Sequence, residues 1–139
     1  GHADGTGSAA MFKEPTTVSI SPDGMRLFVT DNGNYRIRQI VIATGAVSTL
    51  AGSADYGHAD GTGAAASFSS MFGAAVSPDG ALLFVGDNHL IRQVVIATGE
   101  VTTLAGSGDF GALWGVATSP DGALLFAVNS DDQILRIPA

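Results

Sequence analysis

Short apolar runs separated by turn-forming residues recur through the whole chain. Three of these runs, at positions 25–30, 81–86 and 123–128, are almost continuously hydrophobic, as expected of strands that are covered on both faces. The segment at 16–21 alternates apolar and polar residues, and the segment at 35–42 has β-branched residues at half of its positions. The pattern predicts an all-β protein built from short strands.

The same four-residue turn precedes each of the three apolar runs. Ser-Pro-Asp-Gly occurs at 21–24, 77–80 and 119–122. Proline presets φ for the first central position of a type I turn, aspartate suits the second, and glycine takes the left-handed position that closes a bulged hairpin. The aspartates that we expect to shape these turns are Asp23, Asp79 and Asp121.

The turn spacing indicates three repeats of one antiparallel unit. The turns lie 56 and then 42 residues apart, because the linker before the third turn is shorter. Each of the first two units is expected to hold a meander of four strands, and the third lacks its fourth strand. The eleven predicted strands span 16–21, 25–30, 35–42, 47–50, 73–76, 81–86, 90–96, 101–104, 115–119, 123–128 and 133–137.

A motif rich in arginine and asparagine recurs at the start of the third strand. It reads Asp-Asn-Gly-Asn-Tyr-Arg-Ile-Arg-Gln-Ile at 31–40 and Asp-Asn-His-Leu-Ile-Arg-Gln-Val at 87–94. The closing strands at 47–52 and 101–106 share the pattern Val-x-Thr-Leu-Ala-Gly, and a glycine-rich linker occupies 60–68. In these segments the chain resembles the NHL-repeat β-propeller family, and the resemblance recurs in register over essentially the whole chain.

The resemblance implies a partial β-propeller, an open arc of NHL-like four-stranded antiparallel blades within a single domain, 1–139. Two complete blades are expected at about 12–53 and 68–107, and an incomplete one at about 113–139. Propellers close with four to eight blades, and this family usually with about six. An open arc leaves an apolar face and a strand edge uncovered. We therefore expect further blades or protein partners to complete or cover the arc, and not an isolated monomer.

Paired acidic and basic residues mark the second and third strands of the first two units. Asp31 and Asp87 end the second strand, and Arg38 and Arg92 lie on the strand that follows. Such residues at the mouth of a hairpin are able to serve catalysis, but their repetition in successive units favours ion pairs and turn caps that hold a blade together. The third unit departs from the pattern, with asparagine for the aspartate and leucine for the arginine.

The histidines are expected to have structural roles. His2 and His58 occupy the same place in two copies of the linker sequence Gly-His-Ala-Asp-Gly-Thr-Gly, and such equivalent positions are normally separated by the width of a blade. His89 stands where the first unit has Tyr35, an exchange that favours packing or a hydrogen bond over metal ligation. No catalytic set, metal site or cofactor is predicted.

Two aromatic residues beside the shortened linker are the candidate partner contacts. Trp114, the single tryptophan, lies close to Phe110, and aromatic side chains are enriched at binding hot spots. The alternative for Trp114 is packing against the neighbouring blade.

Composition narrows the classes of partner. The formal net charge of −7 argues against nucleic acid and against anionic lipid as partners. No apolar run approaches the roughly 20 residues of a membrane helix, and the chain has no cysteine. The chain starts within a repeat, so any targeting segment would lie upstream of Gly1, and the compartment stays open.

These observations favour a non-enzymatic interaction or scaffold module, a fragment or accessory subunit of a larger assembly. The alternative is a fragment of a propeller enzyme of the lyase or lactonase type, whose catalytic residues lie outside this chain. The family resemblance implies channel-facing histidines or acids for that class, whereas the candidate inner strands at 16–21, 73–77 and 115–119 carry none.

Overall fold

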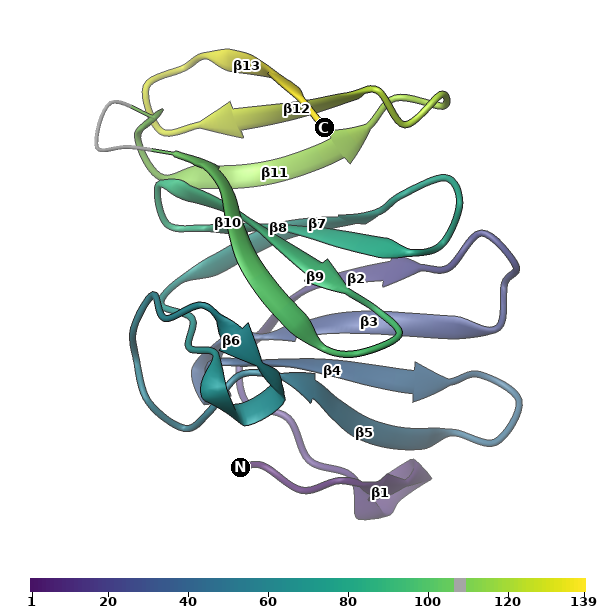
Figure 1. Ribbon diagram of the computed structural model, residues 1–139. Coiled ribbons are helices and arrows are strands. Elements are labelled where there is room, and N and C mark those ends of the chain that lie inside the picture. The colour runs from purple at the N-terminus through teal and green to yellow at the C-terminus, as the bar shows by residue number, and fades with distance from the viewer. Residues whose placement is uncertain (107–109) are drawn as a thin grey trace.

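Three antiparallel sheets follow one another along the chain and stack as neighbouring layers in the computed structural model (Figure 1). The structure describes residues 1–106 and 110–139. We call the three sheets blades 1, 2 and 3. The all-β open arc of propeller blades is thereby confirmed. Position 107, the expected end of the second blade, lies outside the described residues.

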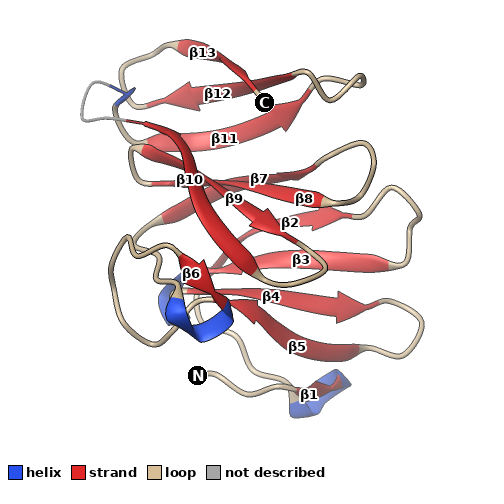
Figure 2. Ribbon diagram, in the orientation of Figure 1, coloured by secondary structure: helices blue, strands red, loops and turns tan. Residues whose placement is uncertain are grey.

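Strands make up most of each blade, and the helical segments among the described residues are single turns of 3-10 helix (Figure 2). Blade 1 has the strand order β1-β5-β4-β3-β2, and blade 2 the equivalent order β6-β10-β9-β8-β7. Blade 3 has three strands in the order β11-β12-β13. The bounds are β1 (Gly5–Thr6), β2 (Pro15–Ile20), β3 (Arg26–Asp31), β4 (Arg36–Val41), β5 (Ala46–Ala51), β6 (Gly61–Thr62), β7 (Met71–Val76), β8 (Leu82–Asp87), β9 (Leu90–Val95), β10 (Glu100–Gly106), β11 (Leu113–Thr118), β12 (Leu124–Asn129) and β13 (Ile134–Pro138).

Two short strands, β1 and β6, add to the eleven that the sequence predicts. Gly5 of β1 pairs with Val47 of β5, and Gly61 of β6 pairs with Val101 of β10. Each linker therefore folds back onto the outermost strand of the blade that follows it in sequence. Two-residue strands are too short to produce an alternating pattern, so sequence periodicity does not reveal them.

The three Ser-Pro-Asp-Gly turns adopt the conformation that their chemistry predicts. Gly24, Gly80 and Gly122 have φ angles of 74°, 77° and 76°, in the left-handed region that glycine enters without steric cost. Each turn joins the first two strands of its blade's meander, which sets the register of that hairpin. The described residues contain no helix long and apolar enough to cross a membrane.

The hydrophobic core lies between blades. Side chains of blade 1 such as Phe28 and Ile37 pack with Leu83 and Val85 of blade 2, and a second cluster joins blade 2 to blade 3. The inner strands β2, β7 and β11 lie side by side. At their closest approach, a Cβ added to Gly73 would stand 2.6 Å from Cα of Gly115. Blade 2 therefore depends on contacts with both neighbours.

We expect Gly73→Ala to destabilise the protein more than Gly24→Ala does. Both glycines have positive φ, but a Cβ at Gly24 meets no atom within 4 Å, whereas at Gly73 it meets the backbone of blade 3. The left-handed conformation alone costs about 1–2 kcal/mol, and overpacking adds about 1–3 kcal/mol. Urea denaturation of both variants measures the difference; equal losses of unfolding free energy would contradict the close packing of β7 against β11.

Candidate functional site

A fully buried arginine lies at the centre of each complete blade. Arg38 of β4 and Arg92 of β9 have no exposed side-chain surface. Arg38 Nη1 lies 2.9 Å from Oδ2 of Asp31, and Arg92 Nη1 lies 2.9 Å from Oδ2 of Asp87. Both carboxylates are also buried. The aspartate and arginine positions of the repeated motif thus meet as an ion pair within each blade.

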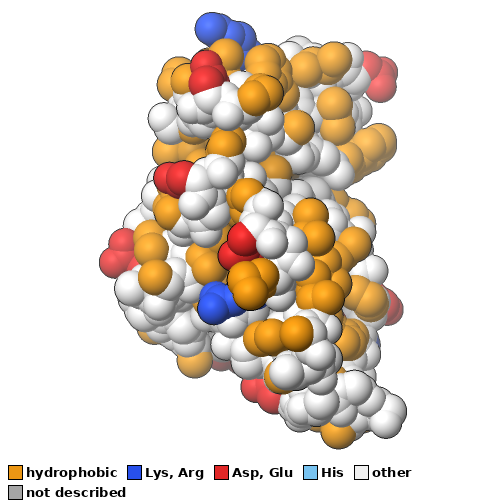
Figure 3. Space-filling model, turned by 90° about the vertical axis from the view of Figure 1, so that its right-hand side faces the viewer, with side chains coloured by type: hydrophobic (Ala, Val, Ile, Leu, Met, Phe, Trp, Pro, Cys, Tyr) orange, Lys and Arg blue, Asp and Glu red, His pale blue; other side chains and the backbone are white. Residues whose placement is uncertain are grey.

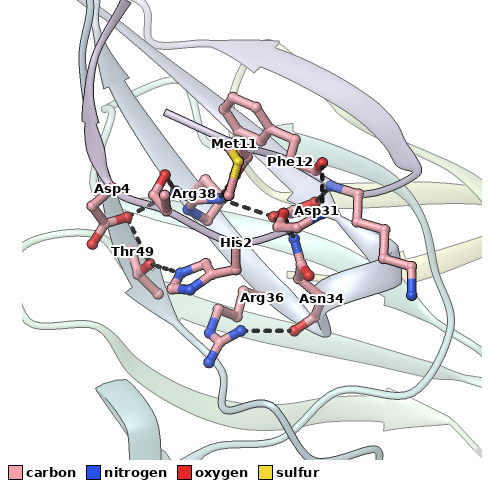
Figure 4. Close-up of polar contacts among 12 residues, drawn as sticks. His2, Asp4, Met11, Phe12, Asp31, Asn34, Arg36, Arg38 and Thr49 are labelled. Atoms are coloured by element: carbon pink, nitrogen blue, oxygen red, sulfur yellow. Dashed lines mark hydrogen bonds and ion pairs between the residues drawn. The ribbon is translucent and has the colours of Figure 1, made fainter. Parts of the chain in front are cut away.

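The same guanidinium also binds the linker that runs across its own blade (Figure 4). Arg38 donates to the carbonyl oxygens of Met11, at 2.8 Å, and Ala3, at 2.7 Å, and to Oδ1 of Asp4, at 2.8 Å. Arg92 donates to the equivalent partners, namely the carbonyl oxygens of Ser67 and Ala59 and Oδ1 of Asp60, at 2.9, 2.9 and 3.0 Å. We call Arg38, Asp31 and Asp4, and likewise Arg92, Asp87 and Asp60, the arginine clusters.

The buried aspartate of each cluster caps the chain that leads into the first strand. Oδ1 of Asp31 accepts a hydrogen bond from the backbone N–H of Lys13, at 2.7 Å. Oδ1 of Asp87 accepts bonds from the backbone N–H groups of Ser69 and Ser70 and from the Ser69 hydroxyl, at 2.8 to 2.9 Å. One carboxylate therefore satisfies both the arginine and the backbone, which is the condition for keeping a charge buried.

An aromatic ring covers each guanidinium. The carbon Cζ of Arg38 lies 4.8 Å from the ring centre of Phe12, and that of Arg92 lies 5.0 Å from the ring centre of Phe68. The Nε atoms of both arginines are buried and find no hydrogen-bond partner among the described residues. The attraction between cation and ring offsets part of that desolvation.

In blade 1, the outer carboxylate Asp4 and the linker histidine His2 have pKa values that respond to this charge. Burial tends to raise the pKa of Asp4, but hydrogen bonds from Arg38 and Thr49 outweigh it, so the pKa lies below its usual value. Burial lowers the pKa of His2, and the charges of Arg36 and Arg38 lower it further. His2 Nε2 lies 3.1 Å from Oγ1 of Thr49, which itself bonds Asp4. His2 is thus part of the linker's attachment to β5.

Blade 3 replaces the charged cluster with neutral residues. Leu135 pairs with Ala127, just as Arg38 pairs with Val29 and Arg92 with Val85 in the other blades. Asn129, at the position of the buried aspartates, donates to the carbonyl oxygen of Phe110 at 2.6 Å and bonds its own hairpin. The arginine, the aspartate and the Gly-His-Ala-Asp-Gly linker are absent together from the third unit's sequence.

Sequence reasoning missed the roles of Asp4 and Asp60. The signal was available, because the linker sequence occurs in the two units that keep the arginine and not in the third. The local sequence gave no reason to connect Asp4 to Arg38, which lies 34 residues away, because that contact depends on the linker folding back onto its own blade.

A row of rings crosses the boundary between the first two blades. Tyr35 meets Tyr56 edge to face at 5.7 Å between ring centres, Tyr56 meets His58 at 6.3 Å, and His58 meets His89 at 5.9 Å. Nδ1 of His58 lies 3.8 Å from Oδ2 of Asp87. The sequence did not predict the approach of His58 to His89. No group of three or more metal-ligating side chains is found within the described part of the chain.

The three turn aspartates form identical hydrogen-bond networks. In the first turn the Ser21 hydroxyl donates to Oδ1 of Asp23 at 2.5 Å, and the backbone N–H of Met25 donates to the same oxygen at 2.9 Å. These bonds, from the serine first and the backbone second, lower the pKa of Asp23. Asp79 and Asp121 form the same contacts in their own turns, and their pKa values are lowered in the same way. The side of the molecule that carries these turns shows hydrophobic and acidic side chains (Figure 3).

The two predicted partner contacts differ in exposure. Trp114 on β11 is 62% exposed, whereas Phe110 is partly buried against the cluster between blades 2 and 3. Trp114 occupies the position of Thr16, whose hydroxyl donates to the carbonyl oxygen of Met71 in the next blade at 2.6 Å. Its role as a partner contact stays a prediction.

Known proteins share both the sequence repeat and the fold. The family of WD domains with the G-beta repeat matches residues 98–137, from the last strand of blade 2 to the third strand of blade 3. The chain is 33% identical over 96 residues to the NHL repeat-containing protein 2 of Gallus gallus, covering 68% of this chain and 13% of that protein. It is 35% identical over 112 residues to the chloroplastic protein SUPPRESSOR OF QUENCHING 1 of Arabidopsis thaliana, covering 74% of this chain and 11% of that protein.

Solved structures show the same fold at low sequence identity. Hydrazine synthase of Kuenenia stuttgartiensis superposes with a TM-score of 0.67 at 22% identity, over 100% of this chain and 36% of that one. An auxiliary nutrient binding protein of Bacteroides thetaiotaomicron gives a TM-score of 0.71 at 16% identity, over 86% of this chain and 36% of that one. The chain therefore spans roughly a third of those structures, and little more than a tenth of the curated relatives above.

We expect Arg92→Met to destabilise the protein by about 3–5 kcal/mol, because Asp87 would remain buried without its partner. The double variant Asp87→Asn with Arg92→Leu, which copies blade 3, should lose less than Arg92→Met alone. Urea denaturation measures both. A double variant that is less stable than the single one would contradict the view that the unpaired charge dominates the loss.

The turn aspartates should make stability depend on pH. Because the folded pKa of each is lowered, the stability they add is present above the unfolded pKa of about 4 and is lost as pH falls through the folded value. The triple variant Asp23→Asn, Asp79→Asn and Asp121→Asn keeps an acceptor oxygen but cannot titrate. Its unfolding free energy should fall less steeply with acid than that of the wild type. Parallel pH profiles would show that these carboxylates do not contribute.

Proposed function

Because the chain belongs to the NHL-repeat β-propeller family, we propose that it acts as a non-enzymatic interaction or scaffold module within a larger assembly. The observation that carries the proposal is the apolar hollow at each end of the arc. Blade 1 has a hollow of about 380 Å³ lined by Phe12, Val18, Val29 and Ile40 among others. Blade 3 has one of about 280 Å³ whose lining includes Phe126, Val128 and Ile134.

Contiguous exposed apolar surface of this kind favours a covering protein. Burial of apolar area drives most protein association, at about 25 cal/mol per Å² removed from water. The hollows lie on the outward faces of the two end blades, and the inward faces of the same blades are covered by blade 2. A further protein surface on each end would complete the layering that the chain already shows.

The polar groups of the arc support a structural role for its charges. Arg38 and Arg92 donate hydrogen bonds to aspartates and to linker carbonyl oxygens within the same blade. A buried charge in a cleft is a candidate for catalysis, but ion-pair networks with a structural role also bury charges, and the repetition of this network in two blades favours the structural role.

The native mass and composition of the particle that holds this chain test the proposal. We expect a particle larger than the 14.0 kDa chain, with stoichiometric protein on the end faces. A catalytically active particle of single-chain mass would contradict it. So would stoichiometric zinc or calcium that survives exhaustive dialysis and is required for catalytic turnover, since this would favour the enzyme-fragment alternative.

A further inference from the structure

The two interfaces between blades use the same two surfaces. Phe28 and Ile37 of blade 1 contribute to the cluster with blade 2, and Phe84 and Ile91 of blade 2 contribute to the cluster with blade 3. We call the surface that a blade turns toward the next one its leading face. The opposite surface, which meets the preceding blade, is its trailing face. The chain thus contains two copies of one leading-to-trailing contact.

Blade 3 repeats the leading face, and none of the described residues covers it. Ile134 pairs with Val128 as Ile37 pairs with Thr30 and as Ile91 pairs with Gly86. Ile37 and Ile91 are 0% exposed, whereas Ile134 is 76% exposed. Phe126 holds the position of the buried Phe28 and Phe84, and it too is exposed.

Blade 1 repeats the trailing face, which no preceding blade covers within the described residues. The pair Leu27 and Ile40 corresponds to Leu83 and Val94 in blade 2, both of which are buried against blade 1. Val18 holds the position of Ala74, which is buried in the cluster between blades 1 and 2. Val18 itself is 61% exposed. The free trailing face therefore has the apolar positions that a leading face packs against.

We propose that the occupant of each free face is a second copy of this chain, paired head to tail, with the leading face of blade 3 on the trailing face of blade 1. This inference rests on the proposed function and names its partner. It follows from continuity, because the contact repeats the two that already hold the arc together. Two three-blade arcs closed in this way give six blades, within the four to eight of the architecture.

Polar groups at the inner strands fit the same pairing. Within the arc, Oγ1 of Thr17 accepts a hydrogen bond from the backbone N–H of Gly73 at 2.9 Å, and the Ser19 hydroxyl donates to the carbonyl oxygen of Ala74 at 3.2 Å. Between blades 2 and 3, the Thr118 hydroxyl donates to the carbonyl oxygen of Val76 at 3.4 Å. Hydroxyl-to-backbone bonds thus join neighbouring inner strands, and among the described residues no ion pair links β2, β7 and β11 that a second copy would have to match.

Sedimentation equilibrium of the 139-residue chain over a concentration series tests the inference. We expect a species of twice the chain mass. Ile134→Asp and Val18→Asp each place a carboxylate on one free face, and each should weaken pairing by about 30-fold or more. Met25→Asp, at an exposed apolar position in the groove between blades 1 and 2, is the matched control and should pair like the wild type.

Mixing the two face variants separates head-to-tail pairing from its alternatives. The Ile134→Asp chain keeps an intact trailing face and the Val18→Asp chain an intact leading face, so an equimolar mixture should regain a two-chain species. The same two substitutions in one chain should not. Loss of pairing with Ile134→Asp but not with Val18→Asp would indicate a symmetric contact between leading faces and would overturn the inference.

A wild-type chain that stays at single-chain mass throughout the series would also overturn it. If a different protein then bound the end faces, the proposed function would stand and only the identity of the partner would fall. Circular dichroism spectra matching the wild type exclude misfolding as the cause of any loss, since both substituted side chains are largely exposed.

Discussion

The burial of one guanidinium per blade is the constraint on which the complete blades depend. A charge with no exposed surface must find its hydrogen bonds inside the protein, and Arg38 and Arg92 find theirs on two different segments. One segment is the second strand of the meander and the other is the linker. The arginine therefore joins the part of the chain that enters a blade to the part that forms it. The net contribution of such a pair to stability is modest. Removing one partner, however, leaves the other charge buried without compensation, and this is strongly destabilising.

Blade 3 shows what the fold does without that constraint. Its arginine position holds Leu135, its aspartate position holds Asn129, and its sequence lacks the Gly-His-Ala-Asp-Gly linker. The remaining three strands keep the register of the other blades, because the Ser-Pro-Asp-Gly turn and the apolar contacts with blade 2 still fix them. The arginine cluster thus attaches the linker to the blade, whereas the turn and the interblade core stabilise the meander.

Sequence reasoning predicted the meander well and the linker poorly, for physical reasons. The turn at 21–24 and the run at 25–30 are local signals, and both the hairpin and its left-handed glycine follow from them. The pairing of Gly5 with Val47 and the bond from Arg38 to Asp4 are non-local, and they depend on the path of the linker. The approach of His58 to His89 is missed for the same reason.

Hydrogen exchange of the linker amides in an Arg92→Met variant tests the central role of the arginine most directly. The backbone N–H groups of Gly63 and Ser67 donate to the carbonyl oxygens of Gly99 and Ala59, on or beside the segment that Arg92 holds. We expect these amides to lose protection in the variant, while the amides of the β8–β9 hairpin keep more of theirs. Equal loss of protection in the linker and in the hairpin would show that the arginine stabilises the blade as a whole. That result would contradict its assignment as the attachment of the linker.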